Sequence, residues 1–258
     1  MFELNVSNPI CSQAVILKAV KTMHRYVVLI IFTVTTIRLF CISTVAWAVG
    51  DGHAPWVGES LAGISCTGSN PMNYGPYDYI TRKDKLAVVE NAHFNQSVQQ
   101  LVAGINAAGP TTDIDYTLRV IPNHHGALNS AMQFEILEER NLRAVEIQKG
   151  KTGYKLRSPV ECYMQRAVNY SPLDGTSHML YAVFLHRKGQ LEEAEKRYQI
   201  ALKVSPGVPN IEYNYGLLLV DLGKYAQARE IAQRLYTTKF PLKGLKKKLV
   251  SQDEWDSD

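Results

Sequence analysis

Three histidines are the side chains of this sequence whose types and spacing come closest to those of a catalytic or metal site. They are His93 and the adjacent pair His124 and His125. Imidazoles bind transition metals and transfer protons near neutral pH. Two ligands on one helix must be three or four residues apart to face the same ion, whereas neighbouring residues point in different directions. The pair therefore predicts one packed and one solvated side chain more readily than a metal site.

Three carboxylates, Glu90, Asp113 and Asp115, are candidate partners for these histidines. A carboxylate orients an imidazole and raises its pKa, but the same contact is common in purely structural roles. The sequence has no nucleophile elbow, phosphate-binding glycine loop, dinucleotide fingerprint or zinc-protease helix. We therefore predict that the protein is not an enzyme and binds no cofactor. A metal-dependent hydrolase that uses the three histidines is one alternative.

The N-terminal region has the parts of a secretory signal. Basic residues precede a long apolar run over 26–49, and Ala46-Trp47-Ala48 places small residues at the −3 and −1 positions of a cleavage site. We predict a signal peptide over 1–48, cleavage after Ala48, and a mature protein in the periplasm. Because this leader is long, Met23 is an alternative start.

The apolar run is also long enough to span a bilayer, so an inner-membrane anchor over 26–49 is the alternative to cleavage. Arg38 within it disfavours an anchor, because a charge at mid-membrane costs about 3 kcal/mol. Membrane contact is expected only through an uncleaved leader. The formal net charge of +4 falls to +1 (4 − 3) without the leader, which holds four basic residues and one acidic residue. A charge so near zero argues against nucleic-acid binding.

Cysteine usage predicts one disulfide. Of the four cysteines, Cys11 and Cys41 lie in the leader, and only Cys66 and Cys162 remain. Two cysteines in an exported protein indicate a bridge between them. This bridge would join the irregular N-terminal segment to the rest of the chain. Two buried free thiols are the alternative.

A repeat of 34 residues organises the C-terminal half. Pro172, Tyr181, Gly189 and Ala194 return 34 positions later as Pro206, Tyr215, Gly223 and Ala228. This is the period of the tetratricopeptide repeat, which is one helix–turn–helix unit. We expect its helices near 175–188, 191–204, 209–222 and 225–237. The small residues allow the helices of a unit to approach closely, and the glycines lie at the turns.

The predicted fold is all-α, a tetratricopeptide-type right-handed superhelix of helix–turn–helix repeats with an irregular N-terminal arm. The expected parts are an extended arm over 49–82, a helical segment over 83–122, about three repeat units over 123–244, and a capping helix with an acidic tail over 245–258. The first unit is interrupted by an insertion at 140–157. We also expect an acidic turn at 113–116 and a helix with Ser158 as its N-cap.

The concave side of such a stack is lined by the first helix of each unit. The residues expected there are Thr176, Met179, Val183 and Arg187, followed by Asn210, Tyr213, Asn214, Leu217 and Asp221. Met179 and Val183 occupy positions where carboxylate-binding repeats have Lys and Asn. A groove of this composition favours an apolar or helical segment. Packing of the same side chains against the arm is the alternative.

Several stretches outside the regular repeats resemble known sequences. They are Asn70-Pro71, Gly75-Pro76-Tyr77-Asp78-Tyr79, Glu90 with His93-Phe94, Asp115-Tyr116-Thr117-Leu118, Pro122-Asn123-His124-His125, Val160-Glu161-Cys162-Tyr163 and Pro241-Leu242 with Gly244-Leu245. With these, residues 66–249 resemble an uncharacterised group of exported proteobacterial tetratricopeptide proteins. The resemblance implies an exported helical-repeat protein and no reaction.

These observations predict a periplasmic protein–protein interaction module, or scaffold, that binds a protein or peptide of the cell envelope through its concave groove. A self-assembling structural protein of the envelope, whose arm docks in the groove of a neighbouring copy, is the other alternative. The sequence identifies neither the partner nor the oligomeric state.

Overall fold

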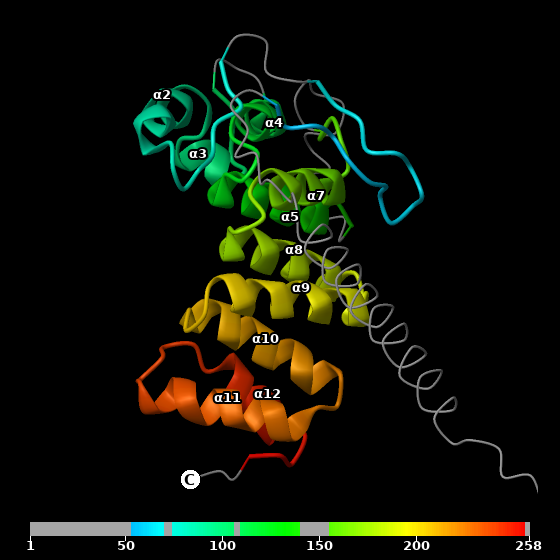
Figure 1. The fold of residues 1–258 in the computed structure, drawn as a ribbon, viewed down its shortest axis with the longest axis vertical. Helices are drawn as coiled ribbons and strands as arrows, with labels where there is room; N and C mark the ends of the chain where they lie inside the picture. The colour runs from blue at the N-terminus through cyan, green and yellow to red at the C-terminus, as the bar shows by residue number, and fades with distance from the viewer. Residues whose placement is uncertain (1–52, 70–73, 106–108, 140–154, 256–258) are drawn as a thin grey trace, which may run out of the picture. The chain divides into compact units, whose positions relative to one another are not determined.

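The computed structural model describes residues 53–69, 74–105, 109–139 and 155–255 (Figure 1). The predicted leader, its cleavage site and the alternative start at Met23 lie outside the described residues, as does most of the predicted insertion. Val49–Asp258 forms one compact unit. Within the described ranges, we find no helix whose length and apolar character would let it cross a membrane.

The described residues form helices and no strand; one isolated bridge joins Glu59 and Ser65. The predicted all-α class is therefore confirmed. The helices are α2 (Lys83–His93), α3 (Gln96–Gln99), α4 (Pro110–Val120), α5 (His125–Glu139), α7 (Val160–Tyr170), α8 (Gly175–Arg187), α9 (Leu191–Val204), α10 (Pro209–Asp221), α11 (Tyr225–Thr237) and α12 (Gly244–Val250). Helices α8 to α11 begin and end within one residue of the positions expected from the repeat.

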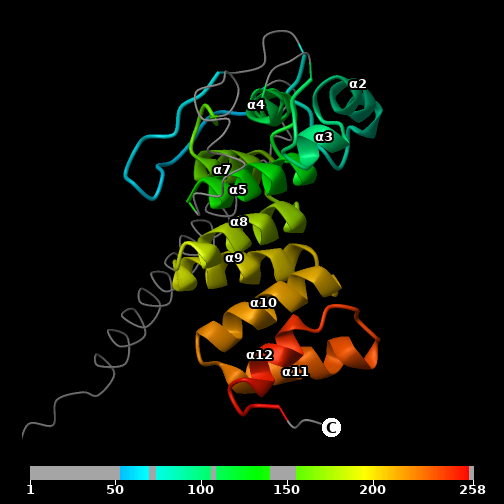
Figure 2. The same cartoon turned by 180° about the vertical axis from the view of Figure 1, so that it is seen from behind.

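From α5 onward, each helix packs against the one before it, as both views of the ribbon show (Figures 1 and 2). Small residues lie where these helices are closest. Ala182, Ala194 and Ala228 are completely buried. A Cβ added at Gly216 of α10 would lie 2.6 Å from a methyl carbon of Leu245 in α12. The residue types that define the repeat are thus those that allow close helix contact.

Helices α8 and α10 end with the same left-handed turn. Gly189 and Gly223 follow them at φ of 74° and 69°, and the amide of the next residue bonds to the carbonyl five positions back, at 2.9 and 2.8 Å. This is the Schellman arrangement, in which glycine is favoured because it has no Cβ. Helix α11 ends the same way, but Lys239 stands at the left-handed position with φ of 60°.

Exchanging the residues at these turns should change stability in opposite directions. We expect Gly223→Ala to lower the free energy of unfolding by about 1 kcal/mol, because a Cβ is strained at this φ. Lys239→Gly relieves the same strain and should raise it by a few tenths to about 1 kcal/mol. Urea unfolding followed by circular dichroism measures both, and equal signs for the two variants would contradict the assignment.

Helix α4 corrects the turn expected at 113–116. Pro110 is the first residue of this helix and starts it, since proline needs no hydrogen-bond partner there. Asp113 and Asp115 are buried in the helix rather than exposed in a turn. Asp113 accepts a hydrogen bond from the Ile105 amide at 2.7 Å, and Asp115 accepts one from the Tyr163 hydroxyl, also at 2.7 Å. These distant partners make buried carboxylates tolerable in α4.

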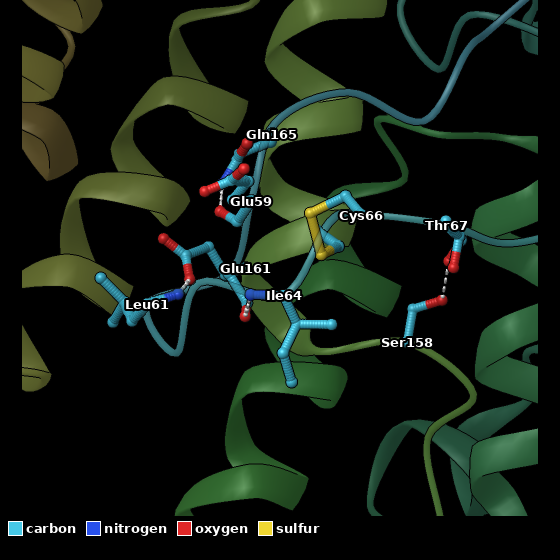
Figure 3. The surroundings of a disulfide bond; sticks show 10 residues. Glu59, Leu61, Ile64, Cys66, Thr67, Ser158, Glu161 and Gln165 are labelled. Carbon is cyan, nitrogen blue, oxygen red and sulfur yellow. Dashed lines mark hydrogen bonds between the residues drawn. A yellow bond between two sulfur atoms is a disulfide. The ribbon is translucent and has the colours of Figure 1, made fainter.

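The arm over 53–69 lies against α7 and is joined to it by the disulfide between Cys66 and Cys162 (Figure 3). The predicted pairing is therefore present, with Cα atoms 5.3 Å apart. Arg166 of α7 is almost completely buried, and its Nε donates to the Ala54 carbonyl at 2.8 Å. The ring of Trp56 packs edge-on against a tyrosine of α7. The arm is thus an ordered layer of the protein.

The start of α7 differs from the expected capping. Pro159 is the N-cap, with φ of −54° and ψ of 143°, and the helix begins at Val160. Ser158 lies one residue too early to cap it. Its hydroxyl instead donates to the Thr67 carbonyl at 2.8 Å, so this serine holds the arm (Figure 3).

Removal of the disulfide should destabilise the protein without changing its helical class. The bridge spans a sequence separation of 96 residues, so its loss restores considerable entropy to the unfolded chain. We expect the double variant Cys66→Ser, Cys162→Ser to lose about 2–5 kcal/mol of unfolding free energy. Urea unfolding with and without a reductant measures this, and only the wild type should respond to the reductant. Two labelled thiols in the unfolded, unreduced mature protein, which lacks Cys11 and Cys41, would contradict the bridge.

Candidate functional site

Helix α8 carries four of the predicted groove residues at helical spacing along one stripe. They are Thr176, Met179, Val183 and Arg187, of which the first three are half-buried and the last is exposed. Helix α10 adds Asn214, whose Nδ2 lies 3.8 Å from the Met179 sulfur. The same Nδ2 donates to the carbonyl of Asn210 at 2.8 Å. The structure therefore places the α8 stripe beside the two asparagines of α10.

Helix α12 lies against the other three groove residues predicted on α10. Tyr213 is buried: its ring centroid lies 5.3 Å from that of Phe240, and a Cβ added at Gly244, the first residue of α12, would lie 2.4 Å from its hydroxyl. Lys248 of α12 donates to the Leu217 carbonyl at 3.5 Å and forms an ion pair with Asp221. The sequence predicted a capping helix here but gave no sign of the face that it covers, because its lysine-rich composition is typical of a solvated helix end.

A hollow of about 450 Å³ lies between α5 and α8. Its lining residues are Met132, Gln133, Glu135, Ile136, Glu139, Phe184, Arg187 and Lys188. Arg187 also belongs to the predicted groove, so the hollow continues the α8 stripe. The α5 residues were not predicted, because the repeat pattern of the first unit is too weak to assign its positions. The apolar periodicity of α5 was the one pattern from which these lining residues could have been predicted.

The charged groups around the hollow are unevenly paired. Lys188 forms ion pairs with both Glu135 and Glu139. Partial burial lowers the pKa of Lys188, but the two carboxylates outweigh it and hold this pKa above its usual value. Arg187, by contrast, is exposed where it lines the hollow.

Each of the three histidines pairs with a different carboxylate. His93 Nδ1 lies 2.9 Å from Asp113 Oδ1, His124 Nε2 lies 3.2 Å from Glu90 Oε1, and His125 Nε2 lies 2.7 Å from Asp174 Oδ2. The third predicted carboxylate, Asp115, instead pairs with Arg119. In the part of the chain that the structure describes, no three His, Cys, Asp or Glu residues are grouped to hold a metal ion. The imidazoles are thus held in separate pairs.

Asp174 is the centre of a buried polar network. Its side chain caps α8 by accepting hydrogen bonds from the amides of Thr176 and Ser177 at 3.1 and 3.2 Å. It also accepts from His125 and from Asn123 Nδ2. Burial raises the pKa of Asp174, but the hydrogen bonds, that from His125 first, outweigh it and lower this pKa. The network fixes the N-terminal layer to the first helix of the regular repeats.

Comparison with known families supports the repeat assignment. Residues 187–242 match the family model described as tetratricopeptide repeat. This segment is a tetratricopeptide-repeat segment. The matched segment runs from the last residue of α8 through α9, α10 and α11. Tetratricopeptide repeats are typically non-catalytic modules that bind other proteins or peptides, and this role accords with the half-buried stripe on α8. No curated protein matches the chain.

His124 should make the stability of this repeat protein depend on pH. Its Nδ1 accepts from the Ala127 amide at 3.1 Å at the start of α5, so the ring is neutral there. Burial lowers the pKa of His124 to about 4, although Glu90 acts in the opposite direction. The unfolded chain, with a His pKa of about 6.5, binds this proton first, so stability is complete above pH ~6.5 and falls as the pH drops towards 4.

Replacing His124 by Asn should weaken this pH dependence. Asn can still accept the Ala127 amide but does not titrate. We expect the loss of unfolding free energy between pH 7 and about 4.5 to be smaller by about 2 kcal/mol in His124→Asn. Urea unfolding at both pH values measures it. His53→Asn, at an exposed position, is the control and should keep the wild-type loss. Identical losses in all three proteins would contradict the buried neutral imidazole.

Proposed function

We propose that this protein is a periplasmic interaction module that binds a polypeptide segment of an envelope partner along the α8 stripe and the hollow beside it. The stripe of Met179, Val183 and Arg187, continued by the hollow next to α5, carries the proposal. Met179 and Val183 are half-buried apolar side chains, the guanidinium of Arg187 is exposed at their end, and the hollow adds both apolar and charged side chains. This composition suits an apolar or helical segment that also carries a polar anchor.

We further propose that α5 and α7 are the first of three repeat units. The contacts support this. Helix α8 packs against α5 and α7, just as α10 packs against α8 and α9, and α12 against α10 and α11. Under this assignment α12 takes the place of the first helix of a fourth unit. It therefore caps the array and limits the open part of the groove to α5, α8 and the start of α10.

The proposed periplasmic location rests on one observation and one prediction. A disulfide joins two distant segments, and disulfides persist in oxidising compartments. The predicted secretory signal provides the route to such a compartment. We also assign structural roles to the three histidines, since each is held by its own carboxylate. We therefore propose binding, rather than catalysis, as the function.

Site-specific crosslinking in the cell envelope tests this function. A photoreactive residue at Met179 or Val183 should crosslink the protein to the same partner, identified by mass spectrometry. The matched control is Lys203, which is exposed on α9. We expect the partner band at both α8 positions and its absence at the α9 position. Adding Arg187→Glu should reduce the yield several-fold, since it reverses the exposed charge at the end of the stripe.

The same experiment separates the alternatives. Identical products from α8 and α9 positions, or no product from α8, would refute binding through this stripe. A crosslink between two copies of the chain would instead support the self-assembling alternative. Light scattering of the purified protein would then show an oligomer.

A further inference from the structure

The tip of the arm, residues 60–64, forms one wall of a second hollow, of about 240 Å³. Leu61 and Ile64 of the arm face α7 and α8 across it, where Phe184 and Lys188 line the other side. Phe184 and Lys188 also line the larger hollow between α5 and α8. The two hollows therefore adjoin, and a ligand on the α8 stripe can extend to the arm.

The arm presents apolar side chains that the protein itself does not bury. The exposed fractions are 46% for Leu61 and 60% for Ile64. Both lie at the edge of a hollow whose floor includes the buried side chains of Val160 and Phe184. Exposed aliphatic groups gathered beside a hollow are typical of interaction sites, unlike apolar residues scattered singly.

Several contacts with α7 hold the arm tip in this position, as Figure 3 shows. Cys66 is bonded to α7 directly after the tip. The Glu161 carboxylate accepts the Leu61 amide, and Gln165 Nε2 donates to the Glu59 carbonyl at 2.6 Å. Because these contacts come from α7, the two aliphatic side chains stay presented and do not fold back into the core. A surface held ready in this way binds at a lower entropic cost.

The charges of the second hollow select the partner's chemistry. Two carboxylates, Glu135 and Glu161, line it, against one ammonium, Lys188. That ammonium is shared with Glu139 at the neighbouring rim. Burial raises the pKa of Glu161, and the charge of Glu135 raises it further, whereas a cation nearby would act in the opposite direction. The hollow thus has a surplus of negative charge that a basic side chain complements.

We infer that the arm tip and α8 together bind a polypeptide segment in which aliphatic side chains adjoin a lysine or arginine. The aliphatic groups pack against Leu61, Ile64 and Phe184, and the basic group lies at Glu161 and Glu135. This inference rests on the proposed function and specifies its ligand. It also gives the disulfide a role in binding, because the bridge holds one wall of the site.

Peptide selection on the purified, oxidised full protein tests this inference. Displayed random peptides are selected, and enriched sequences are synthesised and titrated by fluorescence anisotropy. We expect enriched peptides to combine aliphatic residues with Lys or Arg. Ile64→Asp should weaken their binding about tenfold or more. The matched control Leu173→Asp adds the same charge at a residue that is 68% exposed and lines neither hollow, and should bind like the wild type.

A second variant tests the charge separately from the apolar wall. Glu161→Gln keeps an oxygen that can accept the Leu61 amide but removes the negative charge. We expect it to weaken binding severalfold and to reduce the salt dependence of binding. Circular dichroism and unreduced-thiol labelling of each variant verify that the fold and the disulfide are intact.

The outcomes distinguish this inference from the function on which it rests. Enriched peptides that are acidic, or that bind Ile64→Asp as well as the wild type, overturn the inference alone. Failure of the selection together with specific α8 crosslinks in the envelope also overturns the inference alone. Failure of both experiments removes the proposed function as well.

Discussion

The constraint on which this structure depends is that no helix pair in it can cover its own apolar face. Each pair leaves one face open, and the following helix packs on it: α8 packs against α5 and α7, α10 against α8 and α9, and α12 against α10 and α11. Close approach at Ala182, Ala194 and Gly216 makes the cover tight enough to exclude water. Stacking therefore gives both the stability of the array and the regular placement of the stripe on α8.

The two ends of the array meet this constraint by different means. At the C-terminal end, α12 buries Leu245 and Leu249 over α10 and α11, and its Lys248 pairs with Asp221 of α10. At the N-terminal end the cover includes polar groups, among them the nearly buried Arg166 and Asp174. Buried polar groups are tolerated only when all their partners are in place. Substitutions at this end are thus less well tolerated. The same polar contacts hold the arm in a defined position against α7.

The proposed ligand surface arises where these two modes of packing meet. The α8 stripe belongs to the regular repeats, whereas the arm tip belongs to the irregular layer attached by the disulfide. Phe184 and Lys188 line both hollows and so connect the two parts. A repeat array by itself offers a generic apolar groove. The aliphatic wall added by the arm, together with the carboxylates Glu135 of α5 and Glu161 of α7 beside it, is what would make that groove selective.

The sequence by itself determined the helix class, the bounds of α8 to α11 and the pairing of Cys66 with Cys162. These follow from local patterns and from counting, namely a 34-residue period and two cysteines left after the leader. Only the tertiary structure decided that Asp113 and Asp115 lie in a helix, that α12 covers Tyr213, and that the arm tip lies beside Phe184. Pro110 was a local signal for α4, but the burial of Asp115 against Tyr163 and the positions of α12 and of the arm depend on segments far away in the chain, about which a local pattern carries no information. Whether a carboxylate is buried or an isoleucine is exposed depends on which other segments of the folded chain pack against it.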